Sequence, residues 1–142
     1  MTATDGAQVF FHASAVALDG AGVLILGPSG SGKSSLALEL IALGAELICD
    51  DGVWLADGRL RRPASAPALI EARGIGLLNA GPLREDVPLK LVIDLARAEP
   101  ERLPPRRMAV IGAEKVTLIL GAGQPTLAPA ILHLLRFGRA AP

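Results

Sequence analysis

Short apolar runs separated by glycine mark out the first half of the chain. Val23–Leu26 is wholly apolar, which is typical of a strand buried on both faces. Val9–Leu18 alternates loosely and carries residues that favour strands, and Glu46–Cys49 is predicted to form a further strand. Lys33–Leu43 consists of good helix formers, and three leucines that end with Leu43 share one face of it. The pattern therefore predicts an α/β domain in which a helix follows the buried strand.

The second half of the chain is predicted to be richer in strands. Asp57-Gly58 is a strong signal for a two-residue hairpin between Val53–Ala56 and Arg59–Arg62. The other expected elements are an extended segment over Ala68–Leu78, a charged loop over Ala80–Pro88, strands over Leu89–Leu95, Met108–Ile111 and Val116–Leu120, and a closing helix over Leu127–Phe137. Because no repeat or linker interrupts the pattern, we expect one domain over residues 1–142, with its core at about residues 8–137.

Composition and charge narrow the range of functions. Of 142 residues, 51% are hydrophobic and 3% are aromatic, which suits a packed α/β protein better than a binder that stacks nucleic-acid bases. The formal net charge is +0, so bulk charge attracts neither nucleic acid nor an anionic membrane. No apolar run reaches the roughly 18 residues of a membrane span, and no signal peptide is apparent. We expect a cytoplasmic protein without nucleic-acid or membrane partners, which the single cysteine, Cys49, also fits.

One motif decides the class of chemistry. The phosphate-binding pattern G-x-x-x-x-G-K-[ST] is matched in full by Gly27, Pro28, Ser29, Gly30, Ser31, Gly32, Lys33 and Ser34. Glycines let backbone N–H groups point into one concavity, the helix N-terminus adds positive potential, and the lysine supplies a point charge. The serine hydroxyl is a ligand for Mg²⁺. An accidental glycine turn would not have an apolar strand before it and an amphipathic helix after it, so we expect a small phosphotransferase that binds ATP and Mg²⁺.

Acidic residues follow the next strand. Asp50 and Asp51 close Glu46–Cys49, and the carboxyl ends of strands gather beside the phosphate loop in open α/β sheets. Two adjacent carboxylates there can serve metal binding and base catalysis, although a solvated acidic turn is the alternative. Glu71 and Arg73, two apart on an extended segment, face the same side, but a structural glycine-rich strand explains them equally well.

Four of these pieces, in this order, resemble the catalytic domain of bacterial HPr kinase/phosphorylase, the serine kinase that acts on the phosphocarrier protein HPr. They are His12, the loop at 27–34, the pair Asp50-Asp51, and the segment Ile70–Asn79, which is similar to the signature segment of that family. The resemblance spans about residues 8–137. It implies a P-loop-containing kinase domain of the HPr kinase/PEP carboxykinase-like type, with a mixed β-sheet and few helices.

The resemblance also implies roles for the metal-binding and phosphate-binding residues. Lys33 looks like the phosphate-binding lysine, and Ser34 and Glu71 look like Mg²⁺ ligands. Asp50 is the further carboxylate that we expect at the metal.

The remaining roles concern the reaction itself. Asp51 looks like the acid/base that takes the proton of the acceptor serine. His12 matches the active-site histidine of the family, whereas by itself it would be taken for an ordinary strand residue. Arg102, in Glu101-Arg102-Leu103, resembles the catalytic arginine. An HPr-like phosphocarrier is the partner that this likeness implies, and the family suggests a homo-oligomer, specifically a hexamer.

The chain departs from the usual pattern of the family in three ways. It resembles the short form of alphaproteobacteria, which lacks an N-terminal domain. The segment linked to dephosphorylation is basic in the family, whereas Leu118–Gln124 has no basic residue, so reverse phosphorylase activity is left open. The loop after Asn79 is short, with Gly81–Val87 in place of a longer segment. A catalytically silent ATP-binding regulator and a small-molecule P-loop kinase are therefore the two alternatives.

Overall fold

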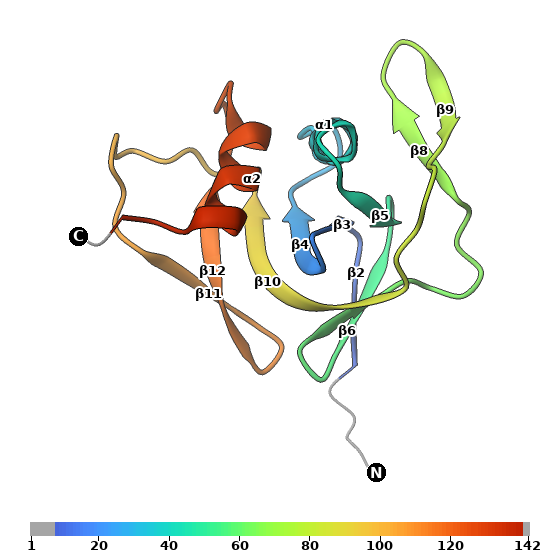
Figure 1. The fold of residues 1–142 in the computed structure, drawn as a ribbon, viewed down its shortest axis with the longest axis horizontal. Helices are drawn as coiled ribbons and strands as arrows, with labels where there is room; N and C mark the ends of the chain where they lie inside the picture. The colour runs from blue at the N-terminus through green and yellow to red at the C-terminus, as the bar shows by residue number, and fades with distance from the viewer. Residues whose placement is uncertain (1–7, 141–142) are drawn as a thin grey trace.

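The computed structural model describes residues 8–140, in which two helices lie against a large mixed sheet (Figure 1). The single-domain prediction also covers residues 1–7 and 141–142, which lie outside the described residues. The elements are β2 (Val9–Phe11), β3 (Ser14–Leu18), β4 (Ala21–Leu26), α1 (Lys33–Ala42), β5 (Glu46–Cys49), β6 (Val53–Ala56), β7 (Arg59–Arg61), β8 (Leu69–Ala72), β9 (Gly76–Asn79), β10 (Asp86–Asp94), β11 (Arg107–Ile111), β12 (Glu114–Leu120) and α2 (Leu127–Phe137).

Strand directions bring several strand ends to one edge of the sheet. The nine-stranded sheet has the order β2-β6-β7-β10-β4-β3-β5, and β12 pairs with β10 and β11. β10 is parallel to β4 and to β12. β3 is antiparallel to both β4 and β5, so β5 runs in the same direction as β4. The carboxyl ends of β4, β5, β10 and β12 therefore point to the same edge.

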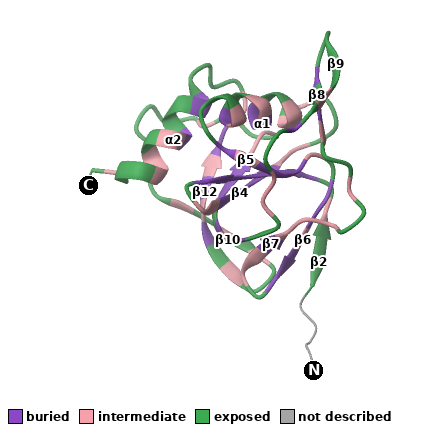
Figure 2. Cartoon of the chain, turned by 45° about the vertical axis from the view of Figure 1, so that its right-hand side comes forward, coloured by how far each residue is buried: buried purple, intermediate pink, exposed green. Residues whose placement is uncertain are grey.

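The central strand β4 is buried on both faces, as the wholly apolar run predicted. Val23 and Ile25 belong to the core beneath α1 and α2, which also contains Leu40. Leu24 points the other way, into a second core that includes Leu60. Figure 1 shows both helices on one side of the central strands, and Figure 2 shows those strands mainly in the colour of buried residues. The fold thus has a helical layer, a central sheet, and a lower layer formed by β2, β6 and β7.

β10 is longer than the sequence predicted, so the expected loop over Ala80–Pro88 is wrong at its end. The strand begins at Asp86 because Val87 is fully buried and the first three residues pair with β7. Pro88 argued against a strand from sequence alone. It is accommodated beside Gly22, where an added Cβ would lie 2.7 Å from the Pro88 carbonyl oxygen. Glycine is therefore needed at that position for the two strands to approach.

The predicted single strand over Val9–Leu18 is two strands. β2 pairs with β6, and β3 pairs with β4 and β5. A bend at His12 and Ala13 carries the chain from the lower layer to the central sheet. Long-range pairing, which the local pattern does not encode, sets this break. His12 consequently lies exposed in the bend and not inside a strand.

The extended segment predicted over Ala68–Leu78 is a hairpin, β8–β9, that forms a separate two-stranded sheet. The Ile75 N–H donates to the Ala72 carbonyl oxygen at 3.0 Å, and Gly74 adopts φ +84° in the turn. A residue with a side chain adopts that φ only with strain. Arg73 is therefore a turn residue and does not belong to the extended segment that was predicted to carry it with Glu71. In Figure 1 the hairpin projects beside α1.

Other predictions are confirmed with small changes at the boundaries. The hairpin at Asp57-Gly58 forms, and both residues have the positive φ, 54° and 72°, that a two-residue type I′ loop needs. α2 has the predicted bounds. α1 ends at Ala42, and Leu43 is 39% exposed. The prediction that Leu43 belongs to the buried face of the helix is therefore wrong. Within the described part of the chain, neither helix is long and apolar enough to cross a membrane.

Candidate functional site

The glycine-rich loop joins the end of β4 to the start of α1. Gly30 and Gly32 have φ values of +84° and +99°, which favour glycine. An added Cβ at Gly27 would meet the Ser31 hydroxyl oxygen, so the loop is too tightly wound for a side chain there. Gly32 precedes α1 and offers no side-chain cap. The first N–H groups of the helix thus remain available for an anionic ligand.

The ammonium group of Lys33 lies over this loop. Its Nζ donates to the carbonyl oxygens of Gly27 at 2.7 Å and Pro28 at 3.0 Å. These contacts bend the side chain back from the first turn of α1 toward the backbone of the loop. The lysine therefore places a positive charge at the concavity that its motif predicts for phosphate.

The Asp50 carboxylate connects three elements of the site. Its Oδ1 accepts a hydrogen bond from the Ser34 hydroxyl at 2.8 Å, and it lies 3.0 Å from the Ser14 hydroxyl. Its Oδ2 accepts the Glu71 N–H at 3.1 Å. Asp50 follows β5, Ser34 belongs to α1 and Glu71 belongs to β8. The sequence-predicted residues Ser34, Asp50 and Glu71 are therefore brought together by direct hydrogen bonds.

A pocket of about 290 Å³ opens beside these groups. Its lining consists of Ser29, Gly30, Gly32, Lys33, Ser34, Ser35, Asp50, Asp51, Glu71 and Arg73. A second pocket, of about 310 Å³, shares Ser34, Asp50, Asp51 and Glu71 and extends to Leu69 and Leu77 of the hairpin. Asp51 is exposed in both pockets. The geometry thus offers one chamber beside the loop and another beside the hairpin, with the acidic residues shared between them.

The oxygen donors fit a hard divalent cation. Ser34 supplies a hydroxyl, and Asp50 and Glu71 supply carboxylates at the same pocket. Among residues 8–140, no group of three or more His, Cys, Asp or Glu side chains is arranged to hold a metal ion. Mg²⁺ normally keeps several waters and takes phosphate oxygens, with one or two carboxylates from the protein. The donor set therefore fits Mg²⁺ bound together with a nucleotide better than a metal held by protein alone.

Two predicted catalytic residues, His12 and Arg102, lie apart from the pocket lining. His12 packs edge-on against Phe10, with ring centroids 5.2 Å apart. An added Cβ at Gly52, the residue after Asp51, would meet the Phe10 ring, so Phe10 lies against the turn that carries Asp51. Arg102 is exposed in the loop between β10 and β11.

Sequence reasoning missed two features of the site. Ser14 is one, because a serine among alanines carries no recognisable motif. The other is the pair of Asp94 and Arg97, which lies where β10 ends next to β4. The carboxylate of Asp94 accepts from Arg97 Nε at 2.8 Å, and Arg97 is 60% exposed. The register of β10 against β4 pairs Asp94 with Leu26, the residue before the glycine-rich loop. A sequence signal for Arg97 was available, because it follows the end of a strand that runs parallel to β4.

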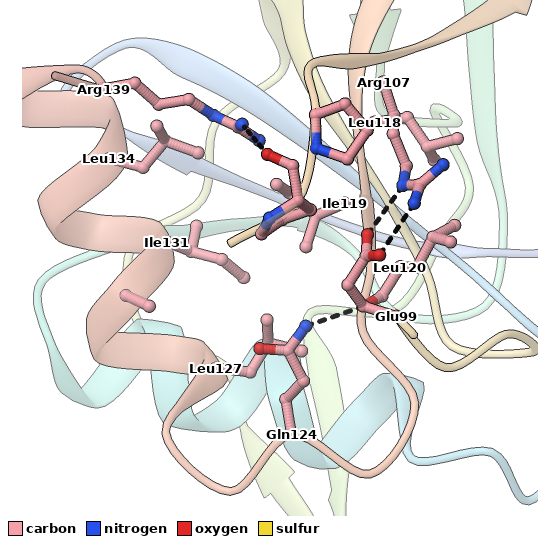
Figure 3. A pocket seen from close by; sticks show the side chains of 13 residues that line it. Glu99, Arg107, Leu118, Ile119, Leu120, Gln124, Leu127, Ile131, Leu134 and Arg139 are labelled. Carbon is pink, nitrogen blue, oxygen red and sulfur yellow. Dashed lines mark hydrogen bonds and ion pairs between the residues drawn. The ribbon is translucent and has the colours of Figure 1, made fainter. Parts of the chain in front are cut away.

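A further pocket, of about 130 Å³, lies between α2, β12 and the loop after β10 (Figure 3). Its walls are mainly apolar and include Ile131 and Leu134. Glu99 accepts two hydrogen bonds from the Arg107 guanidinium, at 2.7 Å each. Those bonds hold the pKa of Glu99 below its usual range. The charges of Glu99 and Arg107 are thus paired with each other, whereas the site beside the glycine-rich loop contains the exposed carboxylate of Asp51.

Known proteins resemble this chain in both sequence and fold. The model of the family described as HPr Serine kinase C-terminal domain matches residues 6–119. The HPr kinase/phosphorylase of Bordetella pertussis is 40% identical over 124 residues, which cover 74% of this chain and 40% of the relative. That of Caldanaerobacter subterraneus is 40% identical over 99 residues, which cover 62% of this chain and 32% of the relative.

A solved structure extends the likeness to three dimensions. The Hpr(Ser) kinase/phosphatase from Coxiella burnetii superposes with a TM-score of 0.73 at 28% identity, covering 90% of this chain and 88% of that chain. The predicted fold, a mixed β-sheet with few helices of the HPr kinase type, is confirmed. The chain spans 32% and 40% of the length of the two curated relatives named above. It belongs to the HPr serine kinase C-terminal domain family.

Proposed function

We propose that this chain is a P-loop protein kinase that transfers the γ-phosphoryl group of ATP to a serine of an HPr-like phosphocarrier protein. The observation that carries the proposal is the hydrogen bond of 2.8 Å between the Ser34 hydroxyl and the Asp50 carboxylate, directly below the glycine-rich loop. It joins the metal-binding hydroxyl of the motif to a carboxylate at the edge where phosphates would bind. Family membership supports both the nucleotide and the acceptor.

Nucleotide binding uses the loop and the first turn of α1. Free backbone N–H groups of the loop and of the first turn of α1 would bind the β-phosphate, apart from Pro28, which has no N–H, and Ser31, whose N–H donates to the Pro28 carbonyl oxygen. Lys33 would bind the β- and γ-phosphates. Lys33 exchanges its bonds to the Gly27 and Pro28 carbonyl oxygens for phosphate oxygens. Ser34, Asp50 and Glu71 would hold Mg²⁺, which when bound would supply positive charge that neutralises the transferred group.

Asp51 is the proposed base. Asp50 is occupied by hydrogen bonds, whereas the neighbouring Asp51 is exposed in both pockets and can meet a hydroxyl from outside. Asp51 accepts the proton of the acceptor serine as its oxygen attacks the γ-phosphorus in line and the bond to the β-phosphate oxygen breaks. A positioned base of this kind typically contributes about 10²–10⁴-fold to the rate.

His12 and Arg102 are proposed as further active-site residues on the family resemblance. The packing of His12 through Phe10 onto Gly52 supports a place beside the turn that carries Asp51. Arg102 lies in an exposed loop and would stabilise charge on the transferred group once an acceptor is bound. Homo-oligomerisation, as a hexamer, is proposed on the same resemblance. The exposed Met108 and Val110 on β11 support self-association.

A labelled-ATP assay separates this function from its alternatives. The protein is incubated with [γ-³²P]ATP, Mg²⁺ and an HPr-like protein encoded by the same genome. Label on a serine of that protein supports the kinase, and label on a metabolite supports a small-molecule kinase. Tight ATP binding without any transfer supports a catalytically silent regulator. Release of the label by inorganic phosphate would reveal phosphorylase activity, which the absence of basic residues from Leu118–Gln124 leaves open.

A further inference from the structure

Ser14 stands out because of where its hydroxyl is buried. Of the polar and charged residues at positions 8–140, Ser14 alone is buried, at 0% exposure. Its neighbours Ala13 and Ala15 are also fully buried. A hydroxyl in such surroundings is unfavourable unless it forms a hydrogen bond. An alanine at this position would need no hydrogen-bond partner. The partner of the Ser14 hydroxyl therefore indicates what the serine contributes to the site.

The partner of Ser14 is Asp50, the residue that directly follows β5. The Ser14 Oγ lies 2.8 Å from the Asp50 carbonyl oxygen and 3.0 Å from Asp50 Oδ1. The pairing of Ala15 with Cys49 between β3 and β5 sets this position, because it brings the residues next to them side by side. The single hydroxyl proton is shared between these two acceptors and lies closer to the carbonyl oxygen, so Ser14 anchors the Asp50 backbone from within the sheet and also contacts its carboxylate.

The same carboxylate oxygen also holds Ser34. Asp50 Oδ1 accepts the Ser34 hydroxyl proton at 2.8 Å while Oδ2 accepts the Glu71 N–H at 3.1 Å. With donors on both oxygens, the carboxylate cannot rotate freely about its bond to Cβ. With its proton committed to Asp50, the Ser34 oxygen has its lone pairs free for a cation.

We propose that Ser14 is a positioning residue for the Mg²⁺–nucleotide site, acting through Asp50 on the orientation of Ser34. This inference rests on the proposed function of the glycine-rich loop. Ser14 has no role in the phosphate contacts themselves, since those come from the loop and Lys33. Its loss removes the bond to the Asp50 carbonyl oxygen and leaves the carboxylate held by Ser34 and the Glu71 N–H alone, so the site is less ordered before Mg²⁺ binds. The effect thus falls on the contribution of the metal and not on binding of the nucleotide alone.

The test compares nucleotide binding with and without the metal. A non-hydrolysable ATP analogue is titrated by calorimetry into the wild type, Ser14→Ala, Ser14→Thr and Val16→Ala, first with Mg²⁺ and then with a chelator. Loss of an outer-shell partner typically lowers metal affinity about 10–100-fold, and we expect the lower end for Ser14→Ala. Binding in chelator should stay at the wild-type level. Ser14→Thr, which keeps the hydroxyl, should restore the Mg²⁺-dependent part of the affinity.

Val16→Ala is the matched control, because it removes more buried volume from the same strand but takes away no hydrogen bond to Asp50. It should lower the thermal midpoint while leaving the effect of Mg²⁺ unchanged. If Ser14→Ala keeps the full effect of Mg²⁺, or if Val16→Ala loses it as well, the positioning role is wrong. Should the Ser14→Thr chain not fold, that comparison between the two other variants still decides. If the wild type binds no nucleotide in the presence of Mg²⁺, the proposed function fails and this inference fails with it.

Discussion

The pocket beside the glycine-rich loop and the pocket between α2 and β12 both contain acidic and basic side chains, but use them differently. In the second pocket, the side chain of Glu99 is 8% exposed and both of its oxygens are bound to Arg107. Beside the loop, Asp51 is exposed, and Lys33 is bound only by backbone carbonyl oxygens, which a phosphate can replace. Charge that the protein satisfies internally stabilises the fold, whereas charge left open to a ligand is available for chemistry.

Replacing the exposed carboxylate of Asp51 should have the largest effect on phosphoryl transfer. Asp51→Asn keeps the size and polarity of the side chain but removes the proposed base, so phosphoryl transfer should fall by about 10²–10⁴-fold. Affinity for the nucleotide, measured by calorimetry, should change little. Asp57→Asn, at an exposed hairpin position that tolerates asparagine at φ 54°, is the control and should transfer at the wild-type rate. Wild-type transfer by Asp51→Asn would mean that another group takes the proton.

Removing the Lys33 ammonium group, which is available to a phosphate, should have the next largest effect. Lys33→Ala eliminates charge-assisted bonds to phosphate, which are typically worth about 1.5–3 kcal/mol each, so nucleotide affinity should fall about 10–100-fold and turnover should fall too. The control is Lys115→Ala, because Lys115 is exposed near the start of β12, at the opposite edge of the sheet. Equal affinities for the two variants would show that the loop is not the phosphate site.

The smallest effect is expected in the α2 pocket, and it should appear in stability alone. The lowered pKa of Glu99 means that the folded chain prefers the ionised form. The pair with Arg107 should therefore stabilise the fold above the ordinary glutamate pKa of 4.5 and lose this contribution as the pH falls below it. Glu99→Gln should slightly lower the thermal midpoint at pH 7 and flatten its decline in acid.

Binding of the nucleotide should be unchanged in Glu99→Gln at pH 7, which calorimetry can check on the same sample. A loss of affinity comparable with that of Lys33→Ala would mean that the two pockets are not independent. An unchanged acid profile would instead show that the pair contributes little to the folding of this region.

The parts of the molecule that local pattern could predict are those in which neighbours in sequence act together. The glycine-rich loop, the buried strand before it and the helix after it form one contiguous unit, and all three were predicted, although the strand begins two residues earlier and the helix ends one residue earlier than expected. The turn at Asp57-Gly58 was predicted for the same reason. In each case the backbone conformation and the burial follow from residues a few positions apart.

What the sequence did not reveal depends on distant partners. The bend at His12 exists because the strands on its two sides join different layers, and β10 begins before Pro88 because a neighbouring strand carries Gly22. Ser14 acquires its significance from Asp50, 36 positions away. No local period marks such a pair, so only the three-dimensional arrangement could identify it.

The length of β10 has a consequence for how the protein opens. Its first residues pair with β7 in the lower layer, and its last residues pair with β4 and β12 in the central sheet. A fluctuation that detaches this strand must expose both cores together, so the two layers should unfold as one cooperative unit. Amide hydrogen exchange should accordingly be slowest along Leu91–Ile93. The edge of the sheet that carries the glycine-rich loop should be equally rigid, because it belongs to the same cooperative unit.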